Sequence, residues 1–175
     1  SDLVKTAEDN GSTTIAFNAS GFTNPVDSIL IPYSQISSMN DAISSSTTVD
    51  SVTLKTTEGT IVLSSAMLNN ISTTVAQSND IIISLSNVTD ATDTPTLSGL
   101  PDDILSSAVV YDLSIKYDNG TPVSLNDTNT STMYVTVPIS EDYASSVVVF
   151  YVNDSGKLVS SCNVIDRGVD TITFE

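Results

Sequence analysis

The residues that could carry chemistry in this chain are carboxylates, one thiol and many hydroxyls, and there is no histidine. The missing imidazole excludes Ser-His-Asp and Cys-His nucleophile systems within the chain, together with zinc sites that use histidine. Cys162 is the one cysteine and cannot form an internal disulfide. Its residue type favours a small buried side chain, with a reactive thiol or an intermolecular bridge as the alternatives. We therefore predict that the chain is not an enzyme, and an ordinary hydrolase is the class of protein that fits it least.

Neighbouring carboxylates are the next candidates for a site. They form the pairs Glu8/Asp9, Asp90/Asp93, Asp102/Asp103 and Glu141/Asp142. None has the alternate-position spacing of an EF-hand loop, so we expect solvated acids and no cofactor. Calcium held by the loop over residues 90–103 is the alternative. A glycosidase pair would need two carboxylates facing each other across a cleft, which the spacing does not indicate.

Asparagine sequons are the third kind of candidate. Eight Asn-X-Ser/Thr sequences begin at Asn10, Asn18, Asn70, Asn87, Asn119, Asn126, Asn129 and Asn153. Serine and threonine make up 52 of the 175 residues, so about this many matches would arise by chance. The signal therefore depends on whether the source organism glycosylates asparagine. Asn119, Asn126, Asn129 and Asn153 are the best candidates for glycosylation, because they lie in or near predicted turns.

The formal net charge of the chain is −16, from 21 acidic and 5 basic residues. Such a surface repels phosphate backbones and anionic lipids, so nucleic-acid binding is excluded as a function class. No run of about 20 apolar residues indicates membrane insertion. We interpret the negative charge as a feature that keeps the protein soluble and makes its copies repel one another at a crowded surface. Cation binding is the alternative interpretation. The serine and threonine content is common on secreted surfaces, so we expect an extracellular or cell-surface location.

The elements that would position these groups begin with a strand–helix half. Its predicted elements are strands over 12–20, 27–34 and 79–88, a hairpin over 49–64, and helices over 34–43 and 64–77. In the first helix Ile36, Met39 and Ile43 recur at i, i+3 and i+7, and Ser34 is expected to cap it. In the hairpin, the turn is expected at 57–59.

The second half reads almost entirely as strand. Val109, Tyr111, Leu113, Ile115 and Tyr117 alternate with polar residues, and this is the clearest period-two pattern in the chain. Further strands are expected over 132–138, 147–152, 157–164 and 170–175, with turns at 118–120 and 153–156. The strand over 147–152 is apolar on both faces, so it is predicted to be central and covered on both sides.

These elements predict a mainly β fold, an antiparallel β-sandwich of the Ig-like or Greek-key type with ten or eleven strands and two short helices. The length fits a single domain over 1–175. The breakers in 89–103 leave open two subdomains, over 1–90 and 101–175.

The order of elements resembles a known family. The matching residues are Val135–Pro138, Val147–Val152, Asn153–Leu158 and Thr171–Phe174, together with "ILIPYSQISSMNDAI" and "TLKTTEGTIVLSSAMLNNI" in the first half. This pattern is similar to the β-sandwich module of extracellular surface proteins of Gram-positive bacteria, often found beside S-layer homology repeats. The resemblance implies a structural part in display, spacing or self-assembly, with self-association or other surface proteins as partners.

The family pattern continues into a last strand containing His-Phe-Ser, and this sequence ends at Glu175, before that strand. The resemblance therefore implies an open sheet edge that a neighbouring chain could fill by strand addition, which would build a filament or an S-layer-like array. A carbohydrate-binding or adhesion module, with exposed tyrosines such as Tyr134 contacting polysaccharide, is a second alternative. The last strand of the family is similar to the self-cleavage site of GAIN domains, so a self-cleaving module is a third.

Overall fold

The computed structural model describes residues 2–19, 24, 26–75, 79–89, 107–125, 132–139, 146–152 and 157–175. Within these ranges the chain forms three helices and eleven strands. The helices are α1 (Asp2–Asp9), α2 (Tyr33–Ser44) and α3 (Ser65–Thr74). The strands are β1 (Thr14–Asn18), β2 (Ser28–Ile31), β3 (Ser51–Lys55), β4 (Thr60–Ser64), β5 (Ile81–Asn87), β6 (Tyr111–Tyr117), β7 (Met133–Pro138), β8 (Phe150–Val152), β9 (Leu158–Ser161), β10 (Val164–Arg167) and β11 (Thr171–Phe174). The predicted mainly β class is confirmed.

The strands form a six-stranded sheet, a three-stranded sheet and a two-stranded ribbon. The strand order is β1-β3-β4-β7-β11-β10 in the large sheet and β2-β5-β6 in the small one, while β8 pairs only with β9. All pairs are antiparallel except β1 with β3, which run parallel. The chain between β1 and β3 contains β2 and α2, which gives the long crossover that a parallel pair requires.

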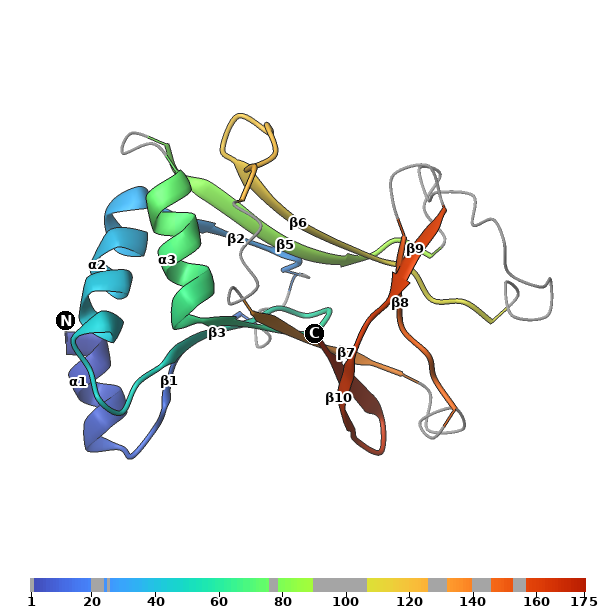
Figure 1. Ribbon diagram of the computed structural model, residues 1–175, viewed down its shortest axis with the longest axis horizontal. Helices are drawn as coiled ribbons and strands as arrows, with labels where there is room; N and C mark the ends of the chain where they lie inside the picture. The colour runs from blue at the N-terminus through green and yellow to red at the C-terminus, as the bar shows by residue number, and fades with distance from the viewer. Residues whose placement is uncertain are drawn as a thin grey trace.

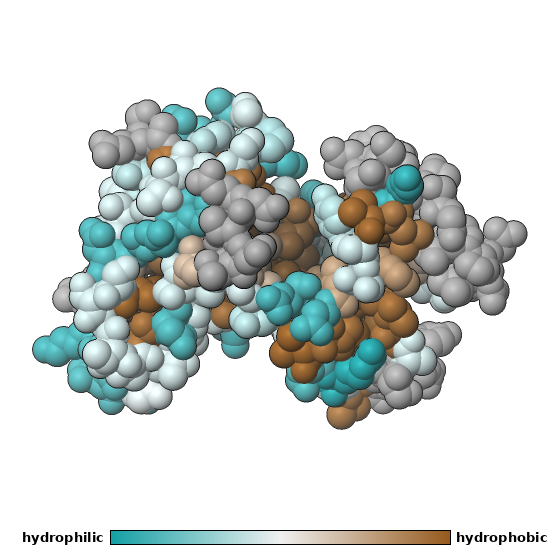
Figure 2. Space-filling model, viewed as in Figure 1, coloured by the Kyte–Doolittle hydropathy of each residue, from teal (hydrophilic) through white to brown (hydrophobic). Residues whose placement is uncertain are grey.

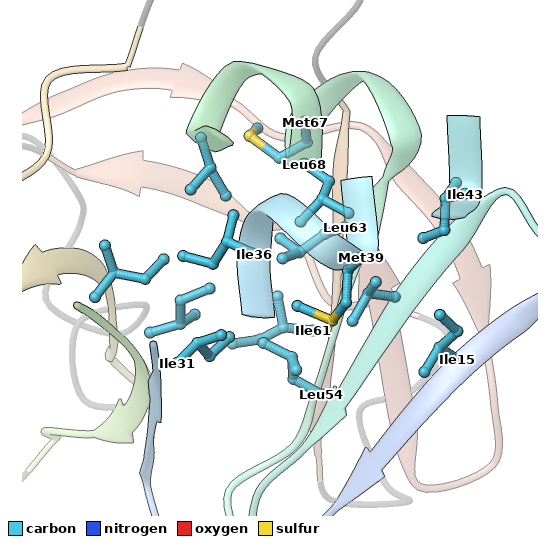
Figure 3. Packing of buried hydrophobic residues seen from close by; sticks show 14 of the residues in the cluster. Ile15, Ile31, Ile36, Met39, Ile43, Leu54, Ile61, Leu63, Met67 and Leu68 are labelled. Carbon is cyan, nitrogen blue, oxygen red and sulfur yellow. The ribbon is translucent and has the colours of Figure 1, made fainter. Parts of the chain in front are cut away.

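The core lies between the two larger sheets and is closed at one end by the helices (Figure 1). Strands β4, β5 and β7 supply alternate residues to it, as Ile81, Ile83 and Leu85 do from β5. Helix α2 supplies Ile36 and Met39, together with Ile43, as the helical spacing predicts. Figure 3 shows these side chains interleaved with those of β3, β4 and α3. Strands from both halves of the chain share this core, since β7 pairs with β4 and β6 pairs with β5.

The start of α2 differs from the prediction. Ser34 does not cap the helix, because the helix begins at Tyr33 and its N-cap residue is Pro32, which has no side-chain acceptor. Asp80 takes over this function from the chain before β5: its Oδ1 accepts a hydrogen bond of 3.2 Å from the backbone N–H of Tyr33. One of the free N–H groups of the first helical turn is thus satisfied by a residue distant in sequence.

Helix α1 was not predicted. Its sequence, DLVKTAED, is short and mostly polar, and only Val4 and Ala7 are buried. Three residues apart, these two side chains lie on one side of the helix and join the core, and α1 packs against β1. The helix count is therefore three within the described residues, not two.

The prediction for residues 147–152 was wrong. The segment is not a central strand covered on both sides, since among the described strands β8 pairs with β9 alone. Val147 and Val149 are partly buried against the core, but Val148, Phe150 and Tyr151 are exposed. The apolar pattern identified a strand correctly, but the described residues do not provide a second layer to cover it.

Candidate functional site

The carboxylates do not come together in the part of the chain that the structure describes. Glu8 and Asp9 are exposed near the end of α1, and Glu8 Oε1 accepts a hydrogen bond of 2.6 Å from the hydroxyl of Ser46. The other pairs, and with them the calcium loop suggested over 90–103, lie outside the described residues. Among the described residues no group of three or more histidine, cysteine or acidic side chains could hold a metal ion.

The sequons fall in different environments. Asn119 is exposed in the turn after β6, where its Oδ1 accepts a 2.9 Å hydrogen bond from the N–H of Thr121, so its side chain is accessible at a tight turn. Asn70 is 6% exposed inside α3, where a glycan could not fit without unfolding the helix. Asn126, Asn129 and Asn153, the other three candidates, lie outside the described residues.

The tyrosines divide into partly buried and exposed rings. Tyr134 of β7, expected to be exposed, is half-buried and lies opposite Val62 of β4. Tyr111 of β6 packs against the core, and its hydroxyl donates a 3.3 Å hydrogen bond to the carbonyl oxygen of Pro138. Burial raises the pKa of Tyr111, and the nearby negative charge of Glu58 raises it further. Tyr151 of β8 is 57% exposed and is therefore, among the described tyrosines, the ring most available to a ligand or a partner.

Cys162 lies in the short connection between β9 and β10 and is half-buried. Its backbone N–H donates a 2.8 Å hydrogen bond to the carbonyl oxygen of Val149, which holds this connection against the start of β8. Burial raises the pKa of the thiol, so the reactive thiolate is disfavoured at neutral pH. This environment fits a structural side chain better than a nucleophile.

A shallow hollow of about 250 Å³ lies where the β3–β4 turn meets β7 and β11. It is lined by Lys55, Thr56, Thr57, Glu58, Gly59, Thr60, Thr136, Val137, Pro138 and Thr171. Two of its hydroxyls are engaged within the fold: that of Thr56 accepts from the N–H of Gly59 at 3.2 Å, and that of Thr136 lies 2.8 Å from the hydroxyl of Thr173. The hollow thus lies where strands meet, and part of its polar lining is already hydrogen-bonded within the fold.

The most unusual surface of the described residues is apolar and lies near the C-terminus. It consists of the exposed side chains of Val148, Phe150, Tyr151, Val159, Ile165 and Val169, which we call the C-terminal ribbon surface. Val169, in the turn between β10 and β11, is 73% exposed. Figure 2 shows apolar atoms gathered over the end of the molecule that carries β8, β9 and β10, opposite the helices. Exposed apolar groups gathered in this way commonly mark a contact with another molecule.

The described strands of the ribbon carry few charged residues compared with the whole chain. The described residues of the ribbon and its connections, 146–152 and 157–165, contain no carboxylate and one cation, Lys157. Asp154 lies in the sequence between β8 and β9, outside the described residues, and Asp166 and Asp170 directly follow Ile165 and Val169. The pattern "VVVFYV" was the sequence signal for this surface, and it was interpreted as a buried strand.

No family model matches the chain, and neither the curated proteins nor the solved structures contain a match to it. The resemblance to surface-protein modules therefore stays a prediction from sequence motifs. Within the described residues, no helix has both the length and the apolar character needed to span a membrane.

Proposed function

We propose that this chain is a non-catalytic structural module of a secreted or cell-surface protein, and that it acts in display, spacing or self-assembly. In this proposal its two larger sheets form the two layers of a β-sandwich, with the helices closing one end. The shared core of β3, β4 and β5 side chains supports this arrangement. The acidic, serine- and threonine-rich surface and the motif resemblance support the extracellular location. The module would need no cofactor for this work.

The observation that carries the proposal is the C-terminal ribbon surface. Large aliphatic and aromatic side chains stand in solvent there, while the rest of the fold buries most of its own. A chain that acted alone would gain by replacing them with polar residues, because exposed apolar side chains promote association. Their presence supports a function in which another molecule covers them.

Strand addition at the edge of the large sheet is an alternative route to assembly. The described edge strand β10 pairs with β11 with a register shift between Val164 and Asp166. It also carries the adjacent charges Asp166 and Arg167. Register shifts and charges are features that natural edge strands use against edge-to-edge pairing. We therefore favour contact through side chains over strand exchange at β10.

Electron microscopy of the native material at high concentration tests the proposed function. Regular fibres, sheets or discrete oligomers would support a structural, assembling module. Separate single-copy particles at every concentration would remove self-assembly, leaving only a spacer or a binding domain.

A carbohydrate-binding module is a second candidate, and the exposure of Tyr151 favours it, because an exposed ring can stack on a sugar. A polysaccharide pull-down with the wild type and with Tyr151→Ser tests this candidate. A carbohydrate-binding function requires that the polysaccharide retains the wild type and does not retain the variant. Tyr134→Ser is a poor probe, since that ring is half-buried in β7.

A further inference from the structure

Almost the same tetrapeptide occurs in two different exposed turns of the chain. Residues 9–12 read Asp-Asn-Gly-Ser and residues 118–121 read Asp-Asn-Gly-Thr, and they contain the two Asn-Gly pairs of the sequence. Asn10 follows α1 and Asn119 follows β6, and both side chains are exposed. An asparagine before glycine is prone to spontaneous deamidation, because glycine has no side chain to hinder closure of a five-membered ring. Since the local sequences match, a difference in rate between the two turns must come from the fold.

The attacking atom of this reaction, the backbone nitrogen of the glycine, is held alike in both turns. The N–H of Gly11 donates a 2.9 Å hydrogen bond to the carbonyl oxygen of Glu8, and the N–H of Gly120 donates one of 2.9 Å to the carbonyl oxygen of Tyr117. The φ angles of the two glycines are +67° and +85°, and among the described residues an added Cβ would meet no atom within 4 Å at either one. Each turn must therefore open one similar hydrogen bond before the nitrogen can attack.

The next N–H along the chain differs between the two turns. The backbone N–H of Thr121 donates a 2.9 Å hydrogen bond to Oδ1 of Asn119. The corresponding N–H of Ser12 donates to the carbonyl oxygen of Ala7 at 2.8 Å, as part of the cap that ends α1. Oδ1 is the oxygen that gains negative charge when the side-chain carbon of the asparagine is attacked. A backbone N–H placed on such an oxygen stabilises the charge as it develops, so the fold favours the reaction at Asn119 over Asn10.

We propose that Asn119 is a site of spontaneous covalent modification, at which the folded chain converts asparagine to aspartate and isoaspartate through a cyclic imide. The nitrogen of Gly120 gives its proton to water and attacks Cγ of Asn119, and negative charge forms on Oδ1, which already accepts from the N–H of Thr121. The bond between Cγ and Nδ2 then breaks, and Nδ2 takes up a proton and leaves as ammonia. One water molecule opens the imide at either of its carbonyl carbons, so the reaction needs no oxidant or reductant.

This modification goes beyond the proposed structural function and does not depend on it. The new carboxylate adds one negative charge to the turn after β6 and removes the Asn-Gly-Thr sequon. A glycan on Asn119 would be attached to Nδ2, which is the nitrogen that leaves in the deamidation. Glycosylation and deamidation therefore compete for the same atom of Asn119.

Peptide mass spectrometry of the folded full chain, produced without glycosylation and aged in neutral buffer, measures both asparagines in one sample. Asn119 should deamidate faster than Asn10 by about twofold to tenfold, which is the effect of one neutral hydrogen bond on a rate. In urea, where both turns are unfolded, the two rates should become equal, because the tetrapeptides match. Electron-transfer fragmentation should identify isoaspartate together with aspartate at residue 119, as opening of an imide requires.

Substitutions at residue 121 test the hydrogen-bond donor directly. Thr121→Pro removes the N–H that bonds Oδ1 of Asn119, and it should lower the rate at Asn119 to that at Asn10. Thr121→Ala is the matched control, since it keeps the N–H and should leave the rate unchanged. Circular dichroism shows whether each variant retains the fold.

Several results would overturn the proposal. They are a rate at Asn119 no higher than that at Asn10 in the folded wild type, a ratio of the two rates that urea leaves unchanged, aspartate without isoaspartate, and a folded Thr121→Pro variant that reacts as fast as the wild type. The wild-type comparison decides the matter even where Thr121→Pro does not fold. Electron microscopy of assemblies has no bearing on these rates, so the proposed function and this modification can fail independently.

Discussion

The backbone of Gly59, at the end of the β3–β4 turn, lies directly against the carbonyl oxygen of Thr136 in β7. A Cβ placed on Gly59 would overlap that oxygen and would come within 3.0 Å of Cδ2 of Leu85. The turn itself is closed by Thr56, whose hydroxyl accepts hydrogen bonds from the N–H groups of Glu58 and Gly59. The absence of a side chain at residue 59 therefore allows the hairpin from the first half of the chain to pair with a strand from the second.

Gly59→Ala should destabilise the fold, because the new methyl group can be accommodated only if β4 moves away from β7. We expect the free energy of unfolding to fall by about 2–4 kcal/mol, within the range of severe single substitutions. Urea unfolding followed by circular dichroism measures it. Gly11→Ala is the control, since Gly11 has φ of +67° with no atom near its missing side chain. It should cost only about 1 kcal/mol of backbone strain. Equal losses at the two glycines would contradict the close approach at Gly59.

The hydroxyls of Thr136 and Thr173 form a cross-strand pair on β7 and β11, 2.8 Å apart and half-buried. A double-mutant cycle with Thr136→Val and Thr173→Val should give a coupling energy of about 0.5–1 kcal/mol, as cross-strand pairs and neutral hydrogen bonds do. Strictly additive losses would show that the two hydroxyls prefer other partners in solution.

Ser64 and Ser34 form a matched pair of serines with which helix capping can be tested. Ser64 caps α3, and its Oγ accepts hydrogen bonds from the N–H groups of Met67 at 3.2 Å and Thr132 at 3.3 Å. Ser64→Ala should lower the free energy of unfolding by about 1–2 kcal/mol. Ser34→Ala should change it by less than about 0.5 kcal/mol, because Ser34 is exposed and does not cap α2. Thermal unfolding compares the two, and a larger loss at Ser34 would restore the cap predicted from sequence.

Alkaline pH should destabilise the fold through Tyr111. Its pKa in the folded chain is raised above the ordinary value of 10.0, first by burial and then by Glu58, so the folded state favours the neutral ring. The contribution to stability is complete below pH 10 and is lost as the pH rises through the higher folded pKa. Tyr111→Phe removes this component, so its free energy of unfolding should fall less steeply than that of the wild type above pH 10. Parallel slopes in urea unfolding across this pH range would show that Tyr111 does not contribute.

Local patterns predicted the elements that depend on residues close in sequence. Alternation identified β6 through Tyr111, Leu113 and Ile115, and helical spacing identified α2 through Ile36 and Met39. The turn at 118–120 was also predicted, and Gly120 has φ of +85° there. Each of these patterns involves residues only a few positions apart in the chain, so the sequence alone was sufficient to predict these elements.

The predictions that failed concern features that depend on contacts between segments distant in sequence. The cap of α2 comes from Asp80, and the parallel pairing of β1 with β3 is made across α2, so neither is visible locally. The prediction that 147–152 is covered on both sides failed for a related reason. The pattern of these residues shows that both faces are apolar, but not whether the same chain covers them. Among the candidate site residues, Asn119 was placed correctly in an exposed turn, while Tyr134 was wrongly expected to be exposed.

The most direct test of assembly through the C-terminal ribbon surface is amide hydrogen exchange of the wild type at low and high protein concentration. Self-assembly through this surface predicts that the amides of 148–152 and 158–161 exchange more slowly as the concentration rises, while those of β2 are unchanged. If the sample associates while the ribbon amides exchange rapidly at every concentration, self-assembly through this surface is contradicted. The contact then lies elsewhere on the molecule.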